Sequence, residues 1–242
     1  MVTAVAVPKA ARTLRGDVRE VGWTVGVGLG VGVLAGYLVI GPLARLLMLL
    51  LRLTSPAAVI GVTSDDGFTI GRFSPTQTLA LLFVCAGLGG TAGVGYVVAR
   101  FAVRHRGLRL ALWTTLCAAV GGAAIVQDGG VDFVLLTPTW LAIAGFVALP
   151  AIGGLIIAVA VDRVSSIPAP GARTRVAIPA TGLLAPPAAG IALVLGALML
   201  ALRSLRSGPR LIRYLRPTAV AMAIILMVLG VVDLVRDVSA LT

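Results

Sequence analysis

The chain alternates long apolar runs with short polar segments. A transmembrane helix needs about 20 mostly apolar residues to cross a hydrocarbon layer of about 30 Å. Six runs reach or approach this length, and Arg109 is the only charged residue within them: residues 21–40, 79–98, 108–126, 140–161, 188–202 and 218–232. The pattern predicts an all-α fold, a polytopic transmembrane helix bundle of about six spans. We expect residues 21–236 to form this bundle, with a basic cytoplasmic N-terminus (residues 1–20) and a short C-terminal tail (residues 237–242).

Composition excludes a water-soluble domain of this length. Apolar residues make up 59% of the chain and charged residues 12%, with a mean hydropathy of +1.06. In a soluble protein the net charge of +11 would suggest nucleic acid, but here the basic residues stand between the apolar runs. We therefore expect anionic lipid headgroups as partners and no nucleic acid. Lys9 is the only lysine among 20 basic residues, a usage typical of high-GC bacteria, which predicts a bacterial plasma membrane.

Basic residues also predict the orientation, because cytoplasmic segments of membrane proteins are enriched in Lys and Arg. With six crossings and a cytoplasmic N-terminus, 12 basic residues fall inside and 8 outside. The second external loop fits this assignment, since it contains Asp128 and Asp132 but no basic residue. The sequence thus predicts a multi-pass protein with its N-terminus in the cytoplasm.

One segment departs from this orientation. Five arginines between positions 203 and 216 fall outside in the six-span count. Pro186 and Pro187 lack backbone N–H donors, so residues 180–202 could form a re-entrant segment, which gives five crossings and an external C-terminus. Alternatively, the arginines lie at the outer surface with their guanidinium groups on lipid phosphates. We favour the second arrangement, with six crossings.

Glycines recur every four residues on the first two predicted spans. Gly28, Gly32 and Gly36 share one face of the first, and Gly89 and Gly93 share one face of the second. Small residues at this spacing let two helix backbones approach closely within a membrane. We expect both sets to serve helix packing, within one subunit in the commoner case or between copies in a homo-oligomer.

Residues 59–73, in the first external loop, hold the only strand pattern in the chain. Two short runs flank Asp66-Gly67, a dipeptide typical of two-residue hairpin turns. With that turn, Thr63 would face Ile70. The sequence therefore predicts a short external β-hairpin.

Two helical features flank this loop. Residues 43–53 predict a short amphipathic helix in the outer interface, in which Arg45 and Arg52 share a face because they are seven residues apart. Ser74 is expected to cap the helix that follows it, with Gln77 completing a capping box.

The sequence carries no motif of an enzyme active site. It lacks a P-loop, a Rossmann glycine pattern, G-x-S-x-G and H-E-x-x-H. Asp162 and Asp233 stand at predicted span ends near arginines, and we interpret both as solvated helix ends rather than functional intramembrane acids. We therefore predict no enzyme activity, no catalytic residue and no cofactor.

The external loops hold the most distinctive polar residues. Their carboxylates could bind a divalent cation, but Asp-Gly is ordinary turn chemistry and the spacing matches no metal-binding loop. We therefore predict no metal site and an external interaction surface instead. That surface comprises Asp65, Asp66, Gly67, Phe68, Arg72, Asp128 and Asp132.

Parts of the middle third of the chain resemble known sequences. The stretches TSDDGFTIGRF (residues 63–73) and DGGVDFVLLTP (residues 128–138), followed by Trp140-Leu and FVALP (residues 146–150), resemble segments of uncharacterised integral membrane proteins from actinobacteria. The resemblance implies a location in a bacterial plasma membrane and carries no function with it.

We predict a non-enzymatic accessory subunit for docking or sensing, whose external loops bind a membrane-protein partner. The alternative is a small permease, in which helix-breaking Pro150, Pro186 and Pro187 frame a substrate cavity. A polar cavity at mid-membrane would favour the permease, and a dry glycine-packed bundle would favour docking. A third class, an enzyme acting on lipid, would need acids or arginines that face one pocket.

Overall fold

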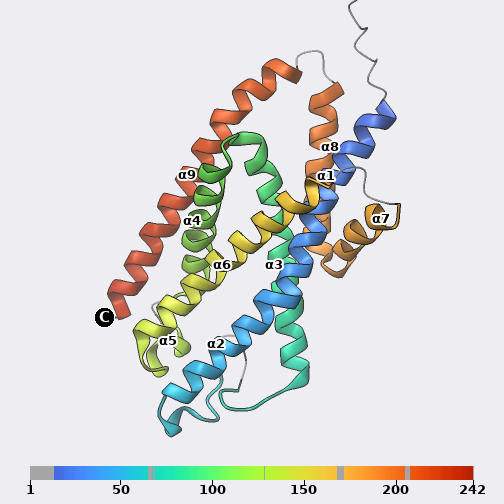
Figure 1. The fold of residues 1–242 in the computed structure, drawn as a ribbon. Coiled ribbons are helices and arrows are strands. Elements are labelled where there is room, and N and C mark those ends of the chain that lie inside the picture. Colours follow the sequence, from blue (N-terminus) through green and yellow to red (C-terminus); the bar gives the residue numbers. More distant parts are fainter. Residues whose placement is uncertain are drawn as a thin grey trace, which may run out of the picture.

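In a computed structural model, the described residues are 14–241 without 65–66, 68, 128, 168–171 and 205–207. They form an all-α bundle (Figure 1). Its helices are α1 (Leu14–Ala35), α2 (Gly41–Thr54), α3 (Pro75–Ala102), α4 (Arg106–Ile125), α5 (Val131–Leu135), α6 (Thr139–Ser165), α7 (Ala172–Ala180), α8 (Pro186–Ser204) and α9 (Gly208–Leu241). Short π and 3-10 turns join some of them: η1 (Gly36–Ile40), η2 (Ala57–Val59) and η3 (Thr181–Leu184).

The amphipathic helix predicted at residues 43–53 exists, but it continues α1 instead of standing alone. Ala35 and Ile40, on either side of the junction, keep helical backbone angles. Gly41 donates its N–H to the carbonyl of Gly36, which is the wider hydrogen bond of a π-turn. Pro42, next in the chain, has no N–H for an α-helical bond. The register widens at this point and the helical rod runs on from Gly16 to Thr54.

Within the described residues, five helices are long and apolar enough to cross a membrane, which indicates a multi-pass membrane protein. They are Gly16–Thr54, Pro75–Ala102, Arg106–Ile125, Thr139–Ser165 and Tyr214–Leu241. The described residues thus hold five candidate spans where six were predicted, and the remaining apolar run forms a shorter helix, Pro186–Ala201.

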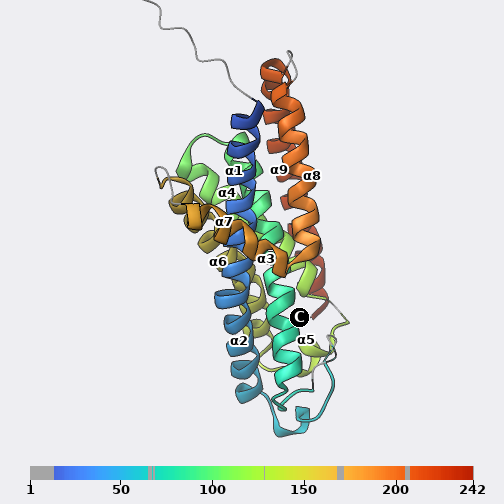
Figure 2. The same ribbon diagram turned by 90° about the vertical axis from the view of Figure 1, so that its right-hand side faces the viewer.

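The sixth apolar run belongs to a hairpin made of α7, η3 and α8. The helix breaks at Ala185, whose backbone leaves the helical region (φ −133°, ψ 75°), because the two prolines that follow cannot donate to a preceding turn. Figure 2 shows α7 crossing α1 and leading into α8. The hairpin lies between the end of α6 and the start of α9, both toward the end of the bundle where α1 begins (Figure 1). This arrangement is the re-entrant alternative.

The apex of this hairpin rests on α1. Thr181 Oγ1 lies 2.7 Å from the carbonyl oxygen of Ile178 and 3.2 Å from that of Gly30. A Cβ on Gly182 would collide with Leu29, and one on Gly30 with the Ile178 carbonyl. Irregular backbone inside a membrane survives only against protein or water, and α1 supplies the protein surface here.

The two glycine sets meet each other between α1 and α3. A Cβ on Gly32 would collide with the carbonyl of Gly89, and one on Gly28 would lie 2.7 Å from that of Gly93. Gly36 approaches the carbonyl of Cys85 in the same way. The absence of side chains brings the two backbones into direct contact, so both sets pack within one subunit.

The predicted β-hairpin at residues 59–73 is wrong: the described residues form no strand and one isolated antiparallel bridge, Thr63 to Thr69. The register differs by one residue from the predicted pairing of Thr63 with Ile70. Gly67 donates its N–H to the carbonyl of Ser64 at 2.9 Å and itself adopts φ +76°. Gly61 and Gly71 also have positive φ, which interrupts the extended backbone at both ends of the predicted pairing.

The predicted cap of α3 is confirmed at Ser74, whose hydroxyl oxygen accepts from the N–H of Gln77 at 3.4 Å. The Gln77 side chain does not complete the capping box. Its Nε2 donates to the Gly67 carbonyl at 3.1 Å, which ties the external loop to the first turn of α3.

Five spans give a direct test by cysteine labelling in a background without Cys85 and Cys117. We expect Gly208→Cys and His105→Cys to react with a membrane-impermeant maleimide from the same side, and Gly130→Cys from the other. The reason is that the hairpin returns the chain to the side from which it entered. Reaction of positions 208 and 105 from opposite sides would show that residues 180–202 cross the membrane as a sixth span.

Candidate functional site

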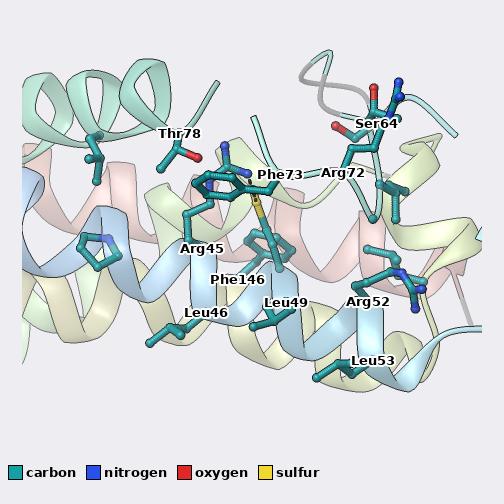
Figure 3. A pocket seen from close by; sticks show the side chains of 17 residues that line it. Arg45, Leu46, Leu49, Arg52, Leu53, Ser64, Arg72, Phe73, Thr78 and Phe146 are labelled. Carbon is teal, nitrogen blue, oxygen red and sulfur yellow. Dashed lines mark hydrogen bonds between the residues drawn. The ribbon is translucent and has the colours of Figure 1, made fainter. Parts of the chain in front are cut away.

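A groove of about 750 Å³ lies between α2, the loop after it, the start of α3 and the α5–α6 region (Figure 3). We call it the arginine groove because Arg45, Arg52 and Arg72 line it. Among the described residues that line it, none is acidic. The described part of the lining therefore carries three basic side chains.

Two of these arginines come from α2 and one from the loop. Arg45 and Arg52 share a face of α2, as their spacing predicts. Arg52 also lies against the loop: a Cβ on Gly71, where φ is +82°, would be 3.1 Å from the Arg52 Nε. The positive φ favours glycine at this position, and the next residue is Arg72. Figure 3 shows Arg72 beside Ser64 at the rim.

Exposed apolar side chains stand beside the guanidinium groups. Leu46, Leu49 and Leu53 on α2 are 60%, 54% and 70% exposed, and Phe73 is 82% exposed. Buried Phe146 belongs to the core cluster below them and reaches the groove. Such a mixture of apolar and basic side chains fits the boundary between headgroups and acyl chains.

The lining of the groove places basic and apolar side chains next to each other. Guanidinium groups match phosphate or carboxylate oxygens with paired N–H donors. The leucines and Phe73 offer an apolar surface next to those donors. The arrangement fits an anionic amphiphile better than a fully polar solute.

A second polar cluster lies at the opposite end of the bundle, around Asp162 of α6. Its carboxylate is 10% exposed and lies 2.9 Å from Arg109 Nη2, 3.4 Å from Arg100 Nε and 3.5 Å from Arg106 Nε. Tyr96 OH donates to Asp162 Oδ2 at 3.0 Å and accepts from Arg109 Nε at 3.0 Å. The interpretation of Asp162 as a solvated helix end is therefore wrong, whereas Asp233 is exposed.

This cluster joins three helices. Tyr96 and Arg100 are on α3, Arg109 is on α4 and Asp162 is on α6. Trp113 packs edge-to-face on Tyr96 at 5.7 Å between ring centroids. The shared carboxylate fixes the ends of α3, α4 and α6 to one another, so we assign the cluster a structural role.

The predicted interaction surface is only partly within the described residues. Arg72 lines the arginine groove and Gly67 forms the turn, while the backbone of Asp132 lies in α5. Asp65, Asp66, Phe68 and Asp128 lie outside the described residues. No group of three or more potential metal ligands occurs in the part of the chain that the structure describes.

Sequence reasoning did not assign Arg45 and Arg52 to the site. Their seven-residue spacing on a helix next to the loop was the available signal. No family model, curated protein or solved structure matches the chain. The function therefore has to come from the geometry of the groove.

Proposed function

We propose that the protein is a docking or sensing subunit of a bacterial plasma membrane that binds a phospholipid with an anionic headgroup in the arginine groove. The observation that supports this most is that three arginines and several exposed leucines line one groove. The phosphate of this lipid would accept hydrogen bonds from the arginines, and its acyl chain would lie along α2.

The distribution of arginines supports an external position for the groove. Thirteen arginines with a described backbone lie near the beginning of α1 and at the α3–α4, α6–α7 and α8–α9 connections. The opposite end has four, namely Arg45, Arg52, Arg72 and Arg236. The arginine-rich end is expected in the cytoplasm. Three of the four arginines at the other end line the groove, so we place the ligand in the outer leaflet.

Ligand binding would be transmitted to the external loop. Arg72 belongs to this loop, and Arg52 touches it at Gly71. The loop is also fixed to α3 through Gln77. A ligand that bridges α2 and the loop would hold the two together, and the loop is the surface expected to contact a membrane-protein partner.

Native mass spectrometry of the delipidated protein tests the proposal with dioleoylphosphatidylglycerol as the probe. We expect Arg45→Gln/Arg52→Gln/Arg72→Gln to weaken one binding event at least tenfold, because a hydrogen bond to a charged group contributes about 1.5–3 kcal/mol. Arg236→Gln, an exposed arginine at the same end of the bundle, is the control. Equal binding by the two variants would refute the proposal, and displacement of the lipid by inorganic phosphate would indicate a free-anion site.

The same spectra address an enzyme that acts on lipid. The arginines meet one requirement of that class, but the described lining residues offer no carboxylate, imidazole or thiol as base or nucleophile. We therefore expect the bound lipid to keep its mass. A time-dependent change of that mass would show that the protein converts the lipid chemically and does not only bind it.

A small permease is the second candidate, and the α7–η3–α8 hairpin favours it, because broken helices often frame substrate sites in transporters. Accessibility of the apex separates the two functions. A cysteine at Thr181, which packs on α1, should resist a water-soluble maleimide if the bundle is dry. Rapid labelling would reveal a water-filled path and favour the permease.

A further inference from the structure

An apolar pocket of about 370 Å³ lies between α3, α8 and α9, at the end of the bundle opposite the arginine groove. Phe101, Leu198 and Met222 contribute one wall each. Arg216 is the only charged residue among the described residues that line it. It lies two residues after Tyr214, where the apolar part of α9 begins. The pocket therefore combines an apolar interior with one basic group near the expected membrane boundary.

Arg216 carries a buried donor that protein atoms do not satisfy. Its Nε has no hydrogen-bond partner among the described residues. The nearby hydroxyl of Thr218 is engaged with the carbonyl of Leu215 at 2.8 Å. A buried donor without an acceptor is costly, so an acceptor from outside the chain would stabilise this arrangement.

The apolar lining of the pocket and the basic residues near it indicate which kind of ligand would fit. Apolar cavities do not hold water well, since a buried water needs polar partners. An acyl chain has the polarity that suits such a space, and a lipid phosphate would offer an acceptor to Arg216. The chain has no acidic residue from position 163 to position 232, whereas this stretch includes Arg203, Arg210 and Arg213. Charge complementarity thus favours an anionic headgroup over a zwitterionic one.

We infer that one acyl chain of an anionic phospholipid from the inner leaflet occupies the pocket, with its phosphate on Arg216. This lipid would fill the space between α9 and the re-entrant helix α8, and so join the last span to the hairpin. The site is separate from the arginine groove and does not depend on the function proposed for that groove.

The test uses full-length protein that carries Arg45→Gln/Arg52→Gln/Arg72→Gln, so that lipid binding in the outer groove does not interfere. Native mass spectrometry with dioleoylphosphatidylglycerol should show one remaining tight binding event, about tenfold weaker after Arg216→Gln. Ala219→Trp and Ala102→Phe fill the pocket from α9 and from α3, and each should abolish that event. Arg236→Gln is the matched control, and circular dichroism identifies variants that fold.

Three outcomes would overturn the inference. The first is that tight binding persists in the folded variants Arg216→Gln and Ala219→Trp or Ala102→Phe. The second is equal affinity for dioleoylphosphatidylcholine, which would show that the headgroup charge plays no role. The third is the absence of any tight binding event in the background variant.

Discussion

Replacement of Asp162 by alanine is expected to destabilise the folded bundle by about 3–5 kcal/mol, because removing one partner of a buried ion pair leaves the other charge uncompensated. Arg109 would bear this cost, since its side chain is 11% exposed and its Nη2 is 2.9 Å from the carboxylate. Tyr96 would lose the acceptor of its hydroxyl at the same time. The ends of α3, α4 and α6 would separate.

Thermal and denaturant unfolding in detergent measure this effect. Asp233→Ala is the control, because Asp233 is exposed on α9 and surface substitutions change stability by about 0.5 kcal/mol or less. The double variant Asp162→Ala/Arg109→Leu should be more stable than Asp162→Ala, since replacing both charges removes the uncompensated one. Similar stability of Asp162→Ala and Asp233→Ala would contradict the structural role of the cluster.

Hydropathy alone predicted the helical class but not the number of spans. Residues 188–202 are as apolar as a true span, and both a full span and a re-entrant helix satisfy their backbone hydrogen bonds internally. The discriminating signals were Pro186 and Pro187 before the run and the arginines after it. A five-span chain returns those arginines to the end where Arg100 and Arg109 lie, which agrees better with the enrichment of basic residues in cytoplasmic segments.

The partners of Asp162 could not be read from local sequence. Arg163 follows it directly and suggested a solvated helix end. The arginine that pairs with the carboxylate, Arg109, is 53 residues away in the sequence, and Tyr96 is 66 residues away. Contacts at such separations depend on how the helices pack. Two of the three guanidinium groups of the arginine groove were easier to place, because Arg45 and Arg52 share a helix and their spacing alone puts them on one face.

The prediction of a β-hairpin at residues 59–73 was wrong for a different reason, which is local. Asp66-Gly67 indicates a turn, and Gly67 donates its N–H to the carbonyl of Ser64, as expected near a turn. However, positive φ angles at Gly61, Gly67 and Gly71 interrupt the extended backbone on both sides of the turn. Strand propensity read over short runs does not register such interruptions, so the pattern overestimated the pairing.

Gly32→Leu is expected to destabilise the bundle by about 1–3 kcal/mol or more, as overpacking of a closely packed interface does. A Cβ at this position would lie 3.0 Å from the Gly90 Cα and collide with the Gly89 carbonyl. These neighbours are backbone atoms, which cannot move aside without separating α1 from α3. The destabilisation therefore follows from the direct contact of two backbones.

Gly22→Leu is the matched control, because it lies on the same helix and a Cβ there would meet nothing within 4 Å. Thermal unfolding in detergent should give a lower midpoint for Gly32→Leu than for Gly22→Leu. Size-exclusion chromatography distinguishes the two roles predicted for Gly28, Gly32 and Gly36, which are packing within one chain and contact between copies. If these glycines served contacts between copies, Gly32→Leu would change the oligomeric state and leave the unfolding midpoint near that of Gly22→Leu. If they pack α1 against α3 within one chain, Gly32→Leu lowers the midpoint and leaves the oligomeric state unchanged.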